Sequence, residues 1–167
     1  MRLSSMADYA VVTMAAAARH CGSAQLVGAD GKKRVRVNAA QLAEETGLPA
    51  PTVQKLVSRL TAAGLLRSSR GVGGGLKLAR PAAAISLADI VEAVEGPIAL
   101  TACVDQGKHD CGLEAACQVK PHWPVVNEAL RGALASIDLV SLSSPFVSSA
   151  VETPSHSFST SLDANGV

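Results

Sequence analysis

Residues 48–81 read LPAPTVQKLVSRLTAAGLLRSSRGVGGGLKLARP and join a helical pattern to a hairpin pattern. Apolar residues between Val53 and Leu60 recur at the spacing of one helix face, and Gly64 then marks the end of that helix. Two strand-like runs, LLRSSR and LKLAR, follow and flank the glycine turn GVGGG. The stretch therefore predicts a helix followed directly by a two-stranded β-hairpin.

A second, shorter helix is predicted just before this stretch. Asn38 and Gln41 have the spacing of a capping box, and Gly47 is placed to end the helix. Two short helices joined by a tight turn describe a helix-turn-helix, and the hairpin adds a wing. We therefore expect a mostly α fold with a small β wing, in which residues 1–82 form a winged helix-turn-helix DNA-binding domain.

Charge is distributed unevenly along the chain. Residues 31–80 contain ten Lys or Arg against two Glu, so this block carries +8 and the remainder −7, within a net charge of +1. A basic block of this kind is typical of a surface that binds a polyanion, although a solvated face explains it equally well. The residues that we expect to contact DNA lie on the second helix and on the wing: Thr52, Gln54, Lys55, Ser58, Arg67 and Arg70.

The composition limits what else the chain can be. It has 167 residues, of which 48% are hydrophobic but only 2% aromatic, so its core must consist of Ala, Val, Leu and Ile. No segment has the length of a membrane span or the layout of a secretory signal, and we expect a cytoplasmic protein with no membrane partner. No set of nucleophile, base and orienting group can be recognised, and the glycine run fits neither a dinucleotide nor a P-loop pattern. We therefore expect neither an enzyme nor a small-molecule substrate.

Residues 83–142 are predicted to contain a capped helix that begins after Ser86, a cysteine loop and a long helix from about Pro124 to Leu142. Apolar residues on the long helix alternate spacings of four and three, which is the coiled-coil period: Val126, Leu130, Ala133, Ile137 and Val140. This pattern predicts a C-terminal dimerisation helix and a homodimer, although packing against the chain's own domain also accounts for it. Residues 143–167 are rich in serine and are predicted to form a disordered tail.

Three of the four cysteines, Cys103, Cys111 and Cys117, fall within one stretch of fifteen residues. Three thiols cannot all pair with one another, and the thiols of a cytoplasmic protein stay reduced, so the stretch favours a metal site. The spacing matches neither a ferredoxin pattern nor a zinc finger built on CxxC pairs. From the residues alone, an iron–sulfur cluster, a zinc ion held with a nearby histidine, and reduced or redox-switching thiols all remain open.

Four segments together resemble a family of winged-helix regulators that includes IscR, NsrR and CymR. They are LSSMADYAV at residues 3–11, the stretch 48–81, ISLADIVEAVEGP at 85–97 and the cysteine loop, and the likeness covers residues 1–142. EGPIALTAC, followed by two further cysteines and a tryptophan, is most similar to the branch that regulates the SUF iron–sulfur assembly system. The resemblance implies a homodimer that binds double-stranded operator DNA through the second helix of the motif and the wing, where Arg70 occupies a minor-groove position.

The resemblance also implies an iron–sulfur cluster on the three cysteines of the loop, which we expect to be [2Fe–2S] rather than [4Fe–4S], with zinc as the alternative. In IscR a histidine three residues after the last cysteine completes the site, but Lys120 stands at that position here. Asp8 is the candidate fourth ligand, since NsrR supplies a carboxylate from its N-terminal helix across the dimer, and His122 is the alternative.

The function implied by the resemblance is that of a sequence-specific transcriptional regulator. It would sense iron–sulfur cluster or redox status and control genes for SUF cluster assembly. Two alternatives are kept: a zinc-stabilised repressor that does not sense, and a winged-helix adaptor that docks another protein through the same face.

Overall fold

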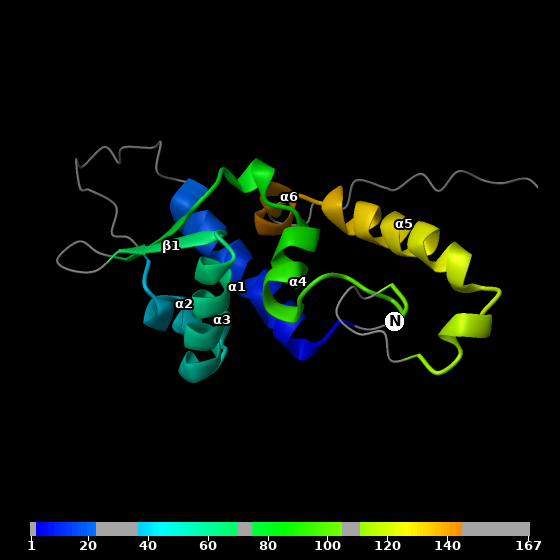
Figure 1. Cartoon of the computed structure of the whole chain (residues 1–167). Helices are drawn as coiled ribbons and strands as arrows, with labels where there is room; N and C mark the ends of the chain where they lie inside the picture. Colours follow the sequence, from blue (N-terminus) through cyan, green and yellow to red (C-terminus); the bar gives the residue numbers. More distant parts are fainter. Residues whose placement is uncertain (1–2, 23–36, 70–74, 105–110, 145–167) are drawn as a thin grey trace, which may run out of the picture.

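The computed structural model of the chain describes residues 3–22, 37–69, 75–104 and 111–144. Within these ranges it contains six α-helices and one two-stranded antiparallel sheet (Figure 1). They follow one another in this order: α1 (Ser5–Gly22), α2 (Ala39–Thr46), α3 (Ala50–Ala62), β1 (Leu66–Ser69), β2 (Gly75–Leu78), α4 (Leu87–Glu95), α5 (Trp123–Ala135) and α6 (Leu139–Ser143). The prediction of a mostly helical fold with a small β wing is confirmed.

α1 lies at the centre of the molecule and packs against α2, α3, α4, α6 and β2. Apart from Thr13 and Met14, its buried side chains are all alanines: Ala7, Ala10, Ala15, Ala16, Ala17 and Ala18. The hydroxyl of Thr13 donates to the carbonyl of Tyr9 at 2.7 Å, so its buried polar atom has a partner inside the helix. The small side chains allow neighbouring helices to approach α1 closely.

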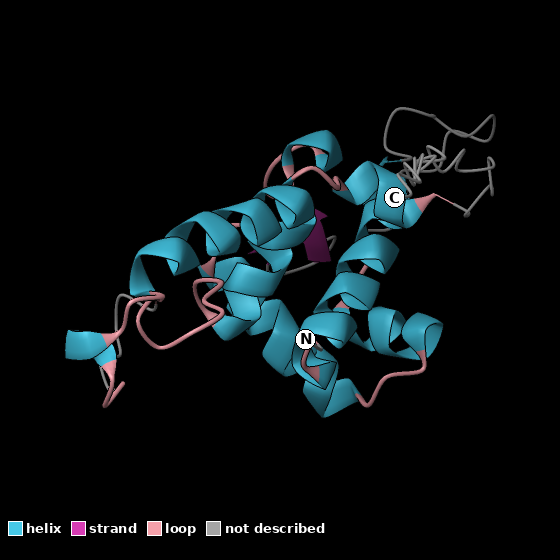
Figure 2. Cartoon of the chain, turned by 90° about the vertical axis from the view of Figure 1, so that its right-hand side faces the viewer, coloured by secondary structure: helices cyan, strands magenta, loops and turns pink. Residues whose placement is uncertain are grey.

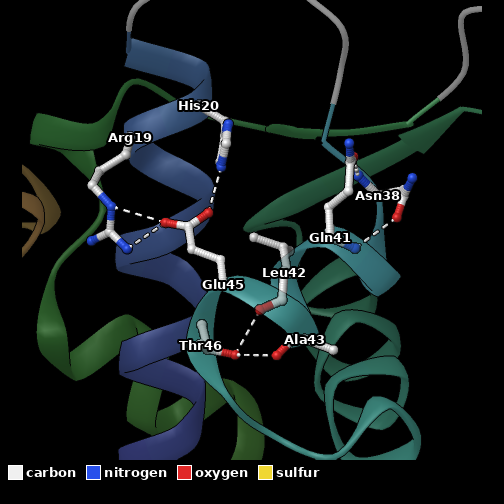
Figure 3. A network of polar contacts seen from close by, with 8 residues as sticks. All are labelled: Arg19, His20, Asn38, Gln41, Leu42, Ala43, Glu45 and Thr46. Carbon is white, nitrogen blue, oxygen red and sulfur yellow. Dashed lines mark hydrogen bonds and ion pairs between the residues drawn. The ribbon is translucent and has the colours of Figure 1, made fainter.

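α2 and α3 form the predicted helix-turn-helix, and the start of α2 is shown in Figure 3. Asn38 Oδ1 accepts the N–H of Gln41, and Gln41 Oε1 accepts the N–H of Asn38, both at 2.9 Å, which confirms the capping box. α2 ends at Gly47, whose φ of 69° lies in the left-handed region that favours glycine. α3 has Pro51 in its first turn, and Gly64 follows its end at a φ of 73°. Local sequence signals therefore set the boundaries of both helices.

The wing is an antiparallel pair of strands in which Arg67 lies opposite Lys77. Leu66 and Leu76 are buried and anchor the hairpin to the core. The N–H of Leu76 also donates to the carbonyl of Val37 at 2.7 Å, which ties the chain just before α2 to the wing. Residues 70–74, at the tip of the hairpin, lie outside the described ranges.

The long helix predicted over residues 124–142 is interrupted, which corrects the expectation from its apolar spacing. Asp138 begins a separate helix, α6, by accepting the N–H of Ser141 at 2.8 Å, and this bond and one from the Ser141 hydroxyl lower the pKa of Asp138. Leu139 is fully buried, and its N–H donates to the carbonyl of Ile85 at 2.8 Å. The chain turns between α5 and α6 because the turn brings Leu139 into the core around α1.

All but the first two residues of the tail predicted at 143–167 lie outside the described ranges. None of the helices within those ranges combines the length and the hydropathy that crossing a membrane requires.

A charged cluster joins the end of α1 to α2 (Figure 3). Arg19 donates to Glu45 Oε1 from Nε at 3.2 Å and from Nη2 at 2.7 Å, and His20 Nε2 lies 2.5 Å from Glu45 Oε2. The hydrogen bonds from Arg19 and His20 hold the pKa of Glu45 below its ordinary value of about 4.5. Because this pKa is lower in the folded protein, the stabilisation is complete above the ordinary pKa and is lost as pH falls through the folded pKa.

We therefore expect Glu45→Gln to lower the free energy of unfolding at pH 7 by about 0.2–1 kcal/mol, the range for partly exposed ion pairs. The difference from wild type should shrink as the pH falls below about 4.5, because the wild-type carboxylate is then protonated as well. Urea denaturation followed by circular dichroism at several pH values measures this difference. Glu44→Gln, at the exposed neighbouring position, is the matched control. An equal loss of stability in both variants would contradict the role given to the cluster.

Candidate nucleic-acid interface and cysteine segment

The solvent-facing side of α3 is polar. Gln54, Lys55 and Ser58 are exposed, and Thr52 in the first turn is half-buried. The opposite side of the helix is fully buried in the core: Val53, Leu56 and Leu60. The Ser58 hydroxyl donates to the Gln54 carbonyl at 3.0 Å, and its oxygen can still accept a hydrogen bond. Burial of the apolar side therefore determines which side chains α3 offers to a partner.

Two basic residues, which we call the wing pair, lie opposite each other on the hairpin. Arg67 on β1 and Lys77 on β2 are direct neighbours in the antiparallel register, and both are exposed. Like charges at directly opposite positions repel each other, so a bound anion such as a phosphate would relieve the pair. Lys77 was not among the predicted interface residues, because only the strand register places it beside Arg67. The predicted contact Arg70 lies outside the described residues.

The wing and α5 lie at opposite ends of the molecule in Figure 1, with α1 and α4 between them. Figure 2 views the molecule from the α5 end, and the strands there lie behind the helices. The residues that connect α4 to α5, 96–122, form what we call the cysteine segment. The wing and α5, the helix that follows the cysteine segment, therefore occupy different ends of the chain's fold.

Within the cysteine segment, Cys103, Cys111 and Cys117 are half-buried and none of them forms a disulfide. The hydroxyl oxygen of Thr101 lies 3.2 Å from Cys103 Sγ. Among the residues that the structure describes, no three Cys, His, Asp or Glu side chains gather closely enough to hold a metal ion. Metal binding by these three thiols would therefore require the described cysteines to come closer together, as expected where metal binding is coupled to local folding.

The two candidates for a fourth ligand are both exposed. Asp8 lies in the first turns of α1, and His122 lies in the 3-10 helix Lys120–His122 that precedes α5. Thiolates, imidazole and carboxylate all bind iron or zinc, so the donor set fits such a group by its chemistry.

A buried amide ties the start of the cysteine segment to α5. Asn127 is 8% exposed, its Oδ1 accepts the N–H of Leu100 at 3.0 Å, and its Nδ2 donates to the carbonyl of Ile98 at 2.9 Å. Both hydrogen bonds hold the chain shortly before Cys103. The sequence reasoning missed Asn127 because its partners lie 27 and 29 residues earlier, and no local pattern connects them.

An ion pair joins α4 to α5. Arg131 donates from Nε and Nη2 to the two carboxylate oxygens of Glu92, at 2.9 and 3.1 Å, and Glu92 raises the pKa of Arg131. A bidentate pair of this kind fixes the relative orientation of its two helices as well as their distance. α4, α5 and the start of the cysteine segment are therefore joined both by the chain and by side chains.

The sequence and the fold are similar to those of known transcriptional regulators. Residues 3–145 match the Rrf2 family, described as "Iron-dependent Transcriptional regulator". The HTH-type transcriptional regulator IscR of Xenorhabdus nematophila is 33% identical over 142 residues, covering 85% of this chain and 79% of that protein. The structure of T. potens IscR has a TM-score of 0.58 at 28% identity, covering 85% of each chain. CymR, the global cysteine regulator of B. subtilis, has a TM-score of 0.61 over 86% of this chain and 96% of its own, and at 24% identity it supports the fold alone.

Proposed function

The chain belongs to the Rrf2 family of transcriptional regulators, and we propose that it binds operator DNA with sequence specificity. We propose further that this binding responds to a metal group held by the cysteine segment. The proposal of DNA binding rests on the exposed polar side of α3 together with the wing pair. Because the family consists of regulators rather than enzymes, no reaction is assigned to the chain.

In the proposed complex α3 lies in the major groove. Gln54 can read adenine through two hydrogen bonds, and Lys55 can contact guanine or a phosphate. The hydroxyls of Thr52 and Ser58 can bind either a base edge or a phosphate. The wing pair would contact phosphates of the flanking backbone, which relieves its internal repulsion.

Substitutions on the two surfaces should have different effects. Gln54→Ala should weaken binding to the operator by about 1–3 kcal/mol and relax its sequence preference, because a base contact is lost. Arg67→Ala and Lys77→Ala should each weaken binding to every duplex and reduce the salt slope by about 1, because a phosphate contact is lost. Fluorescence anisotropy at several salt concentrations, with a fragment of the protein's own promoter and a shuffled duplex of equal length, measures both effects. Equal affinity of the wild type for the two duplexes would instead favour the protein-interaction adaptor.

We also propose that Cys103, Cys111 and Cys117 bind an iron–sulfur cluster, [2Fe–2S] in preference to [4Fe–4S], with zinc as the alternative. The description of the family as iron-dependent supports this proposal, as do three unpaired, half-buried thiols on one segment. A bound cluster supplies a redox-sensitive coordination centre. The chain would contribute three thiolates and a fourth ligand from Asp8 or, alternatively, His122.

Closure of the cysteine segment around this group would change the position of α4 and α5, and through them the affinity for DNA. We propose the genes of SUF iron–sulfur assembly as the targets, which suits a regulator that reports the supply of clusters. The resemblance of EGPIALTAC, the two further cysteines and the tryptophan to that branch supports this assignment. A zinc-stabilised repressor would use the same thiolates without sensing.

Metal analysis of full-length protein purified without oxygen tests the cluster. Cys117→Ser should lose its iron, whereas Cys21→Ser, a half-buried cysteine at the end of α1, should retain it as the matched control. Asp8→Ala should keep the apo fold and alter the visible spectrum. An unchanged spectrum in Asp8→Ala, together with a changed one in His122→Ala, would move the fourth ligand to His122. Stoichiometric zinc without sulfide would contradict the cluster itself.

We further propose that α5 forms a homodimer. Apart from Glu128, the exposed residues of α5 are all small or apolar. Five of them form what we call the α5 outer face: Val125, Val126, Ala129, Gly132 and Ala133. Val125 is 73% and Val126 47% exposed. Leu130, by contrast, is half-buried and lines a hollow of about 300 Å³ with Val91 and Leu134 of the same chain. The predicted apolar stripe is thus divided between packing within the chain and a face available to a second copy.

Ala129→Glu should convert the dimer into a folded monomer, because the interface would otherwise bury an unpaired carboxylate. Ala135→Glu introduces the same charge at an exposed position of α5 outside the outer face and should remain a dimer. Sedimentation velocity measures the association state, and circular dichroism checks that both variants are folded. A folded Ala129→Glu protein that still sediments as a dimer would contradict the role of the outer face.

A further inference from the structure

The last turn of α3 contacts the last turn of α4 through one arginine. The final carbonyls of a helix have no partners within that helix. In α4 the Glu92 carbonyl accepts the N–H of Gly96 at 3.0 Å, and the Val94 carbonyl accepts Nη1 of Arg59 at 2.6 Å. A cation is favourable at this end because the helix dipole makes it negative. Arg59 therefore connects the candidate DNA-reading helix to the C-terminal end of α4.

This end of α4 continues directly into the cysteine segment. Asn127 holds Ile98 and Leu100 against α5, only a few residues after the helix ends. The hydroxyl of Ser4 hydrogen-bonds to the carboxylate of Glu95, so the start of α1 meets the same point. A shift of the chain before the first loop cysteine would therefore act on the carbonyl that Arg59 binds.

We infer that Arg59 is a positioning residue that transmits changes in the cysteine segment to α3, an inference that rests on the proposed function as a metal-responsive regulator. α3 is a single helix of 13 residues, so a displacement at Arg59 moves the whole helix. Gln54 and Lys55 lie one turn earlier on it, and their placement in the groove changes with it. Arg59 thus affects DNA binding through the contact with α4 rather than by touching a base.

The rival explanation is that Arg59, which is exposed, binds a DNA phosphate. The two roles have different consequences. A phosphate contact strengthens binding equally with and without the metal group, so its loss leaves the ratio of the two affinities unchanged. A positioning contact contributes to that ratio.

The first measurement compares DNA dissociation constants of full-length protein without metal and after anaerobic reconstitution with ferrous iron and sulfide. Wild type should show a ratio in the range of about 5–150-fold, typical of allosteric coupling. Arg59→Met should bind the same amount of iron and bring the ratio close to one, and Arg59→Lys, which can still reach a carbonyl, should restore most of it. Arg67→Met, on the wing, is the matched control and should weaken both affinities while leaving the ratio intact. An unchanged ratio in Arg59→Met would overturn the inference.

The second measurement uses no metal, so that failure of the inference can be told from failure of the proposed function. Asn127→Ala releases the start of the cysteine segment and should change the DNA affinity of the metal-free protein several-fold when Arg59 is present. The same substitution in an Arg59→Met background should have almost no effect. Asn127→Asp, which keeps the oxygen acceptor, replaces Asn127→Ala if the latter does not fold. Equal effects of Asn127→Ala in both backgrounds would overturn the inference, whereas a wild-type metal ratio of one would contradict only the proposed sensing.

Discussion

The fold depends on close packing around α1, because α2, α3, α4, α6 and β2 all pack against this helix. Alanine side chains line most of its buried surface, and small contact residues shorten the distance between helix axes. A larger side chain at Ala10 or Ala17, both fully buried, would have to displace a neighbouring element, since protein cores contain little free volume. This arrangement also explains how a chain with 2% aromatic residues forms a core. α3 is packed on its apolar side, and its polar side is left to face a partner.

The elements that could be predicted are those whose signals are local. The capping boxes at Asn38 and Ser86 and the glycines after α2 and α3 act over a few residues, and the structure confirms them. The division between α5 and α6 could not be predicted from apolar spacing, which treats Asp138 as one polar position in a helix. The side chain of Asp138 instead caps α6, and the burial of Leu139 against α1 and Ile85 makes the turn favourable. A tertiary contact, which no local pattern reveals, therefore determines that the chain forms two separate helices here rather than one long helix.

The residues of the candidate site also divide into those indicated by local sequence patterns and those indicated only by tertiary contacts. The polar side of α3 follows from the positions of its apolar residues, so Gln54 and Lys55 could be chosen from the sequence. Lys77 becomes a candidate only through its register opposite Arg67, and Asn127 only through partners that lie 27 and 29 residues earlier in the chain. The three loop cysteines were recognised by spacing and resemblance. Under the proposed function, their mutual arrangement would depend on closure around a metal group, which neither helical periodicity nor residue spacing determines.

The polar contacts at the end of α4 differ physically from the apolar packing on α1. Interlocked apolar side chains resist small displacements, whereas a hydrogen bond from the charged Arg59 to a carbonyl can break and re-form at a cost of about 1.5–3 kcal/mol net. Coupling of a metal group to DNA needs only about 1–3 kcal/mol, which one or two such bonds can supply. Under the proposed function this coupling is reciprocal, so operator DNA must change the affinity for the metal group by the same factor. A regulator built in this way can respond at its polar junction while the alanine core around α1 keeps one packing.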